Sequence, residues 1–194
     1  MCPVSCGQLH LGLVALDANG RLLWQRGDLG AAWNSPAVDP DDGTVFIAAS
    51  ATFVALRPEN GAEKWHVSTK SWMYQAACAM DATTVYRGDN GGVFYAIDKA
   101  GAVKWQFDTG VRGPIYCQPA LGANGLLYFT QAWSSDVAPG ARGRLYALEA
   151  TTGQLLWQYE IGWSSSSPAL TADTLLACGD PGSGKAVLYA FKGH

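Results

Sequence analysis

The chain has 194 residues, with 13 Lys and Arg against 16 Asp and Glu, and a net charge of −3. It contains no Lys/Arg cluster and so lacks the basic patch of nucleic-acid-binding proteins. No apolar run approaches the roughly 18 residues of a membrane-spanning helix. The start of this chain also lacks the basic and apolar segments of a signal peptide.

A segment ending in tryptophan recurs along the chain. The copies read ALDANGRLLW (15–24), ALRPENGAEKW (55–65), AIDKAGAVKW (96–105) and ALEATTGQLLW (147–157). In each copy a glycine lies four residues before the tryptophan, which pairs Gly20 with Trp24, Gly61 with Trp65, Gly101 with Trp105 and Gly153 with Trp157. A fifth copy begins at Ala190. This periodicity indicates a repeat protein.

A second block precedes each of these segments. It reads NSPAV followed by GTVFIAAS, then QAACAMDATTVYRGD, QPALGANGLLYFT and SPALTADTLLACGD. Each repeat therefore holds four short apolar runs separated by turn residues, a pattern that predicts four strands, here called A to D. Four strands every 40 or so residues are typical of a β-propeller blade, which buries its faces by stacking against its neighbours.

The sequence thus predicts a single all-β domain, 1–194, of four-stranded antiparallel blades. About four to five blades are present, with repeats at 4–28, 34–66, 75–107, 117–159 and 167–192. The first repeat is expected to begin within strand B and the last to end after strand C. The four repeat tryptophans are predicted to be structural, each filling the gap to the next blade.

These repeats resemble those of the quinoprotein alcohol-dehydrogenase-like propellers, also called PQQ-like or tryptophan-docking repeats. The resemblance rests on the motif A-[LI]-x-x-x-(x)-G-x-x-x-W and extends from about residue 4 to residue 191. It implies a ring of seven or eight blades, of which this chain would form part. Two open ends would then remain, so self-association that closes the ring is a further expectation.

The same resemblance leaves the function open, because the family includes quinone-dependent dehydrogenases and cofactor-free scaffolds. The dehydrogenases typically carry an adjacent cysteine pair, a calcium-binding cluster and a catalytic Asp. The five cysteines here include no adjacent pair, and no Asp matches that motif. We therefore expect no catalytic, cofactor-binding or metal-binding residue, with pyrroloquinoline quinone plus calcium as the alternative. The resemblance also favours the periplasm.

The remaining tryptophans point to a binding surface. Loops that join strand D to the next strand A, and strand B to strand C, emerge on the same face of a propeller. The residues of this chain expected on that face are Trp33, Trp72, Arg112, Tyr116, Trp133, Asp136, Arg142 and Trp163. Aromatic and Arg side chains dominate binding hot spots, although rings at these positions could also merely cap blade junctions.

Three functions follow from these observations. The first is a non-catalytic scaffold that binds a protein or peptide through this face. The second is a fragment of a quinone-dependent dehydrogenase, and the third is a sensor or accessory domain of a larger enzyme. A P-loop-like run, GDPGSGK (179–185), does not favour nucleotide binding, because Ala186 and a predicted strand follow it.

Overall fold

The computed structural model describes residues 12–29, 34–132 and 142–193, and all regular structure in these ranges is β-strand. The first sheet holds β1 (Leu13–Leu16) and β2 (Leu22–Arg26). The second holds β3 (Ala37–Val38), β4 (Val45–Ala49), β5 (Thr52–Leu56) and β6 (Glu63–Ser68). The third holds β7 (Ala79–Met80), β8 (Thr84–Gly88), β9 (Val93–Asp98) and β10 (Val103–Asp108).

The fourth sheet holds β11 (Ala120–Leu121), β12 (Leu126–Gln131), β13 (Arg144–Glu149) and β14 (Leu155–Glu160). The fifth holds β15 (Ala169–Leu170), β16 (Thr174–Gly179) and β17 (Val187–Lys192). Each strand pairs antiparallel with the next strand of its sheet, as expected for propeller blades. None of the described segments forms a helix that could span a bilayer.

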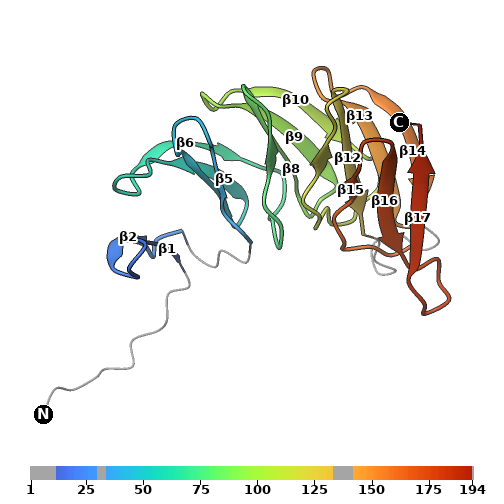
Figure 1. Ribbon diagram of the computed structural model, residues 1–194, viewed down its shortest axis with the longest axis horizontal. Helices are drawn as coiled ribbons and strands as arrows, with labels where there is room; N and C mark the ends of the chain where they lie inside the picture. Colours follow the sequence, from blue (N-terminus) through green and yellow to red (C-terminus); the bar gives the residue numbers. More distant parts are fainter. Residues whose placement is uncertain (1–11, 30–33, 133–141, 194) are drawn as a thin grey trace, which may run out of the picture.

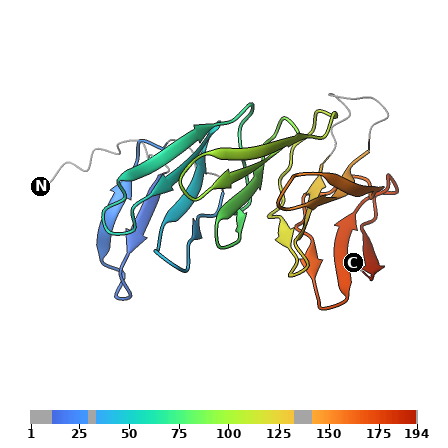
Figure 2. The same ribbon diagram turned by 90° about the horizontal axis from the view of Figure 1, so that it is seen from above.

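The five sheets follow one another around an open arc (Figure 1). In two perpendicular views the β1–β2 sheet and the β15–β17 sheet lie at opposite ends of this arc (Figure 1, Figure 2). The predicted all-β propeller, present as a partial ring, is therefore confirmed. The strand B expected near residues 4–7 lies outside the described residues.

The hydrophobic core lies between the blades. One cluster joins Phe46 and Phe53 of the second sheet to Val85 and Tyr95 of the third, all at most 1% exposed. The middle strands β8 and β9 are therefore buried on both faces, whereas the outer strand β10 alternates between exposed and half-buried positions. Stability consequently depends on contacts between neighbouring blades.

Each of the first three repeat tryptophans contacts the next blade. Their indole N–H groups donate to backbone carbonyls in the following C–D turn: Trp24 to Pro58 (2.7 Å), Trp65 to Lys99 (2.9 Å) and Trp105 to Ala150 (3.0 Å). The repeat glycine of that blade touches the same ring. A Cβ atom at Gly61 would lie 2.6 Å from the Trp24 ring, so only glycine fits there.

The described cysteines have no disulfide partner in the structure. Cys78 and Cys117 are buried, and Cys178 is half-buried. Burial raises the pKa of the Cys78 thiol to about 12, so it remains protonated at neutral pH. Cys78 and Cys117 therefore act as small core side chains.

Candidate functional site

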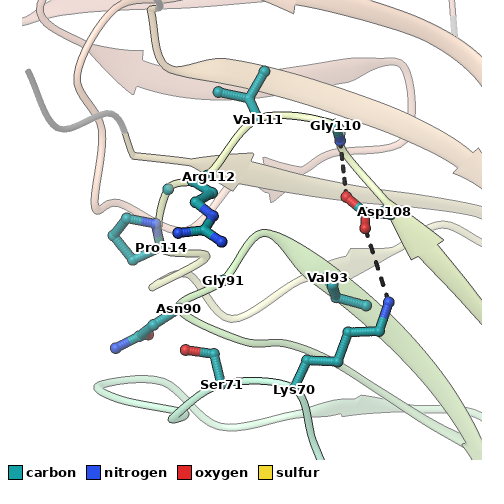
Figure 3. A pocket seen from close by; sticks show the side chains of 11 residues that line it. Lys70, Ser71, Asn90, Gly91, Val93, Asp108, Gly110, Val111, Arg112 and Pro114 are labelled. Atoms are coloured by element: carbon teal, nitrogen blue, oxygen red, sulfur yellow. Dashed lines mark hydrogen bonds and ion pairs between the residues drawn. The ribbon is translucent and has the colours of Figure 1, made fainter. Parts of the chain in front are cut away.

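A cleft of about 810 Å³ opens where two D–A connections and one B–C turn meet (Figure 3). Its lining residues are Lys70, Ser71, Asn90, Gly91, Val93, Asp108, Gly110, Val111, Arg112, Gly113 and Pro114. The D–A connections are residues 69–78 and 109–119, and the B–C turn is 89–92. We call the surface formed by the D–A connections and B–C turns the D–A/B–C face.

The first wall of the cleft is held by Asp89, which is fully buried at the end of β8. Its carboxylate accepts hydrogen bonds from the backbone N–H groups of Ser71 (3.1 Å), Gly91 (2.9 Å) and Val93 (2.9 Å), and from the Tyr95 hydroxyl (3.0 Å). Burial raises the pKa of Tyr95, so the hydroxyl stays protonated and remains a donor. One carboxylate thus fixes both the D–A connection and the B–C turn.

The second wall is held by Gln131, at the corresponding end of β12. Its Nε2 lies within hydrogen-bond distance of the Thr109 hydroxyl (3.0 Å) and of the carbonyls of Val111 (2.8 Å) and Gly113 (2.9 Å). Its Oε1 accepts a hydrogen bond from the Tyr146 hydroxyl (2.9 Å). The buried side-chain amide of Gln131 thus fixes the second D–A connection, as the carboxylate of Asp89 fixes the first.

The charges around the cleft are largely exposed. Lys70 and Asp108 form a loose ion pair at 3.9 Å across it, and Asp108 also accepts the Gly110 N–H at 2.9 Å (Figure 3). Arg112 is exposed and forms no ion pair with another described residue. The buried Oδ1 of Asn90 accepts no hydrogen bond from the described atoms. The cleft thus offers to a ligand the guanidinium of Arg112 as a cation and the Oδ1 of Asn90 as a hydrogen-bond acceptor.

The structure brings some of the predicted face residues together and separates others. Arg112 lines the cleft, and the backbone carbonyl of Trp72 accepts the Asn90 N–H (2.7 Å) at its edge. The Trp72 ring is 53% exposed and packs edge-on against Tyr74. Tyr116 is half-buried in the second D–A connection and does not line the cleft.

Arg142 and Trp163 lie at the fifth sheet instead. Trp163, 51% exposed, exchanges backbone hydrogen bonds with Asp180, and Arg142 donates to the Pro181 carbonyl (2.6 Å) and pairs with Glu160 (3.2 Å). The predicted residues Trp33, Trp133 and Asp136 lie outside the described residues.

The P-loop-like run forms a self-contained turn. Asp180 Oδ1 accepts the backbone N–H groups of Gly182 (2.9 Å), Ser183 (3.0 Å) and Gly184 (3.2 Å). The N–H groups that could have held a phosphate are already bonded to this carboxylate.

Sequence reasoning missed the two buried residues that shape the cleft. A signal for them was present. Asp89 directly follows the apolar strand β8 and Gln131 ends β12, at the position where the second and fifth sheets have Ala49 and Gly179. A polar residue at the end of an apolar strand indicates a buried hydrogen-bonding role.

Among the described residues there is no group of three or more His, Cys, Asp or Glu side chains that could hold a metal ion.

A family model described as outer membrane protein assembly factor BamB, of the PQQ_2 family, matches residues 11–189. The chain belongs to this family. BamB from Moraxella catarrhalis is similar in structure, with a TM-score of 0.68 and 22% identity over 89% of this chain and 50% of that one. Quinohemoprotein alcohol dehydrogenase from Comamonas testosteroni has a TM-score of 0.67 and 18% identity over 93% of this chain and 37% of that one.

A serine/threonine-protein kinase, AfsK of Streptomyces coelicolor, is 32% identical over 157 residues. That match covers 78% of this chain and 17% of the kinase. The chain therefore spans about half the length of the BamB chain and a small part of the kinase.

Proposed function

We propose that this BamB-like propeller is a non-catalytic scaffold that binds a protein or peptide segment through its D–A/B–C face. The observation that carries the proposal is the cleft beside Arg112 and the exposed Trp72 ring. Asp89 and Gln131 hold its two walls before any partner arrives. Such preorganisation lowers the entropic cost of binding.

The charges of the cleft favour an acidic segment. Of the residues that line the cleft, Lys70 and Arg112 are positively charged and Asp108 is negatively charged. The carboxylate of Asp89 lies behind the first wall, where four hydrogen-bond donors satisfy it. The guanidinium of Arg112 can bind a carboxylate with two parallel hydrogen bonds, and the Trp72 ring can cover an apolar neighbour of that carboxylate. The partner sought is thus an extended segment with an acidic group beside an apolar one.

A displayed library of random peptides, selected against the purified chain, tests this function. Arg112→Glu should weaken the selected peptides at least tenfold, because it replaces the recognising cation by a repelling charge. The matched control is Arg57→Glu, which changes another exposed arginine, in a C–D turn on the opposite side of the blade. Equal losses in both variants, or none in either, would exclude the cleft as the binding site.

We further propose that the protein works without a quinone cofactor. The support is the lack of an adjacent cysteine pair in the sequence and of a metal-binding cluster among the described residues. Titration with pyrroloquinoline quinone plus calcium should give no saturable absorbance change. Saturation at micromolar quinone would favour the dehydrogenase alternative.

We also propose that the protein is located outside the cytoplasm, because the family model that it matches is described as an outer membrane protein assembly factor. Fractionation of the source cells with an antibody to this chain tests it. Recovery with cytoplasmic enzymes would count against it.

The similarity to AfsK favours one second candidate, a sensor domain attached to a larger enzyme. A sensor would bind a small ligand, and the volume of the cleft lies within the range of about 300–1,000 Å³ for such sites. Thermal-shift screening of small anions against the protein and its Arg112→Glu variant separates this candidate from peptide binding.

A further inference from the structure

The first D–A connection, residues 69–78, contains a strained turn. Gln75 has a φ of 75°, and the N–H of Ala76 donates to the carbonyl of Tyr74 at 3.1 Å. A hydrogen bond that closes around a single residue of positive φ defines a γ-turn of the rare, strained form. The Gln75 side chain is exposed, so its packing does not impose this conformation.

The equivalent places in the next two D–A connections do not contain this turn. Gln75, Tyr116 and Ser165 each lie four residues before the first residue of strand A. Of these three residues, only Gln75 has a positive φ. For a residue with a side chain, such a conformation persists only where neighbouring groups hold it.

The buried guanidinium of Arg87 is a neighbouring group that holds the turn. Its Nη2 donates to the same Tyr74 carbonyl at 3.3 Å, so this oxygen accepts hydrogen bonds both from within the turn and from β8. Arg87 is 3% exposed, and the residues at its position are Ile47 on β4 and Phe129 on β12. A strained turn and a buried cation, both departures from the repeat, are thus joined by one hydrogen bond.

The same turn places an aromatic ring against Trp72. The ring of Tyr74 packs edge-on against the exposed ring of Trp72, with centroids 5.5 Å apart. Between them, the side chain of Met73 is buried, and its N–H donates to the Ser50 carbonyl at 2.9 Å. Because the backbone is anchored at Met73, the place of the Tyr74 ring depends on the turn that follows it.

We propose that Arg87 is a positioning residue for partner binding, which acts through the turn at Gln75 to hold the Tyr74 ring against Trp72 on the D–A/B–C face. Because it acts on partner binding, this role rests on the proposed scaffold function. Backbone strain and buried charge both lower stability, and strained residues cluster where a binding geometry is held ready. A ring that is already in place loses less conformational entropy when a partner binds.

Two substitutions at Gln75 test the turn itself. Gln75→Gly permits the positive φ without strain, so peptides selected from the displayed library should bind this variant at least as tightly as the wild type. Gln75→Pro fixes φ at about −65° and excludes the turn, so the same peptides should bind roughly tenfold more weakly. The N–H that proline removes donates to no described residue, so the two variants differ chiefly in backbone conformation.

Arg87→Met tests the guanidinium. Without its hydrogen bond fewer molecules hold the turn, so the selected peptides should bind roughly tenfold more weakly, although the variant should be more stable. When Gln75→Gly is added, the turn no longer needs this support, and most of the lost affinity should return. Arg57→Met, which changes an exposed arginine on the opposite side of the blade, should bind as the wild type does. The two Gln75 variants leave the core unchanged, so they test the role even if Arg87→Met does not fold.

Amide hydrogen exchange followed by NMR reports on the turn without any peptide. In Arg87→Met the N–H of Ala76, which closes the turn, should exchange at least about threefold faster than in the wild type. The N–H of Val93, bonded to the buried Asp89, should exchange no faster. If Arg87 affected only the stability of the chain, both N–H groups would exchange at the same rate or more slowly.

The outcomes separate failure of this role from failure of the cleft as a binding site. If Arg112→Glu weakens the peptides but Gln75→Pro and Arg87→Met do not, the cleft binds them and the positioning role is wrong. The role is also wrong if Arg87→Met loses the same affinity in the Gln75→Gly background, or if exchange at Ala76 is not accelerated. If Gln75→Pro weakens the peptides but Arg112→Glu does not, they contact Trp72 rather than the cleft, and the positioning role stands.

Discussion

A single arginine departs from the pattern of the core. Arg87 on β8 is 3% exposed, at a position that is Ile47 on β4, Phe129 on β12 and Ala177 on β16. Burial lowers the pKa of Arg87 to about 10, so it stays charged at neutral pH. Its Nη2 donates to the Tyr74 carbonyl at 3.3 Å, and its Nε has no partner among the described atoms. The fold thus holds a buried cation with little compensation, which is costly.

Replacing this cation should therefore stabilise the protein. Arg87→Met keeps most of the side-chain length and removes the charge, so the free energy of unfolding should rise by about 1 to 4 kcal/mol. Urea titration at fixed protein concentration measures the change. The exposed Arg57→Met should alter it by less than about 0.5 kcal/mol. A loss of stability in Arg87→Met would show that a group outside the described residues compensates the guanidinium.

At the scale of the strand, the repeat tryptophans and the loop tryptophans should differ in energetic role. Trp105 packs against Tyr86 and Phe94 and donates a hydrogen bond to the next blade. The ring is half-buried, so Trp105→Ala should cost about 3 kcal/mol, the lower end of the range for emptying an aromatic core site. The exposed Trp72→Ala should cost less than about 1 kcal/mol. Denaturant titrations compare the two, and similar losses would refute the distinction.

The strands were predictable because their signals are local and repeated. Apolar runs, turn glycines and tryptophans recur with one period, so each repeat supports the assignment of the others. The open arc also followed from counting strands. The repeats could not show which loop residues share a cleft, because Lys70, Asn90 and Arg112 belong to different segments and meet only after the blades stack.

The roles of Asp89 and Gln131 are still harder to predict from the sequence. Their roles depend on backbone groups of D–A connections, whose conformations have no periodic signal in the sequence. The repeats predict Arg112 as a binding residue but not the other residues that line the cleft. The scaffold is therefore predictable from the sequence, whereas the lining of the cleft depends on how the blades pack.

At the scale of the whole molecule, the arc is held together by contacts between neighbouring sheets, because no blade buries both of its faces alone. One buried cluster joins the second sheet to the third, another joins the third to the fourth, and another joins the fourth to the fifth. The described sheets are therefore expected to unfold together rather than one by one.

A substitution at one junction should consequently lower the stability of the whole arc. Phe129 is fully buried and stacks on Phe94 of the preceding sheet with ring centroids 4.3 Å apart, so Phe129→Ala should cost about 3–5 kcal/mol. Calorimetry of the wild type and the variant measures the change, and both should melt in a single transition. Two separate transitions in the variant would contradict this coupling, because they would show that the blades on either side of the junction unfold independently.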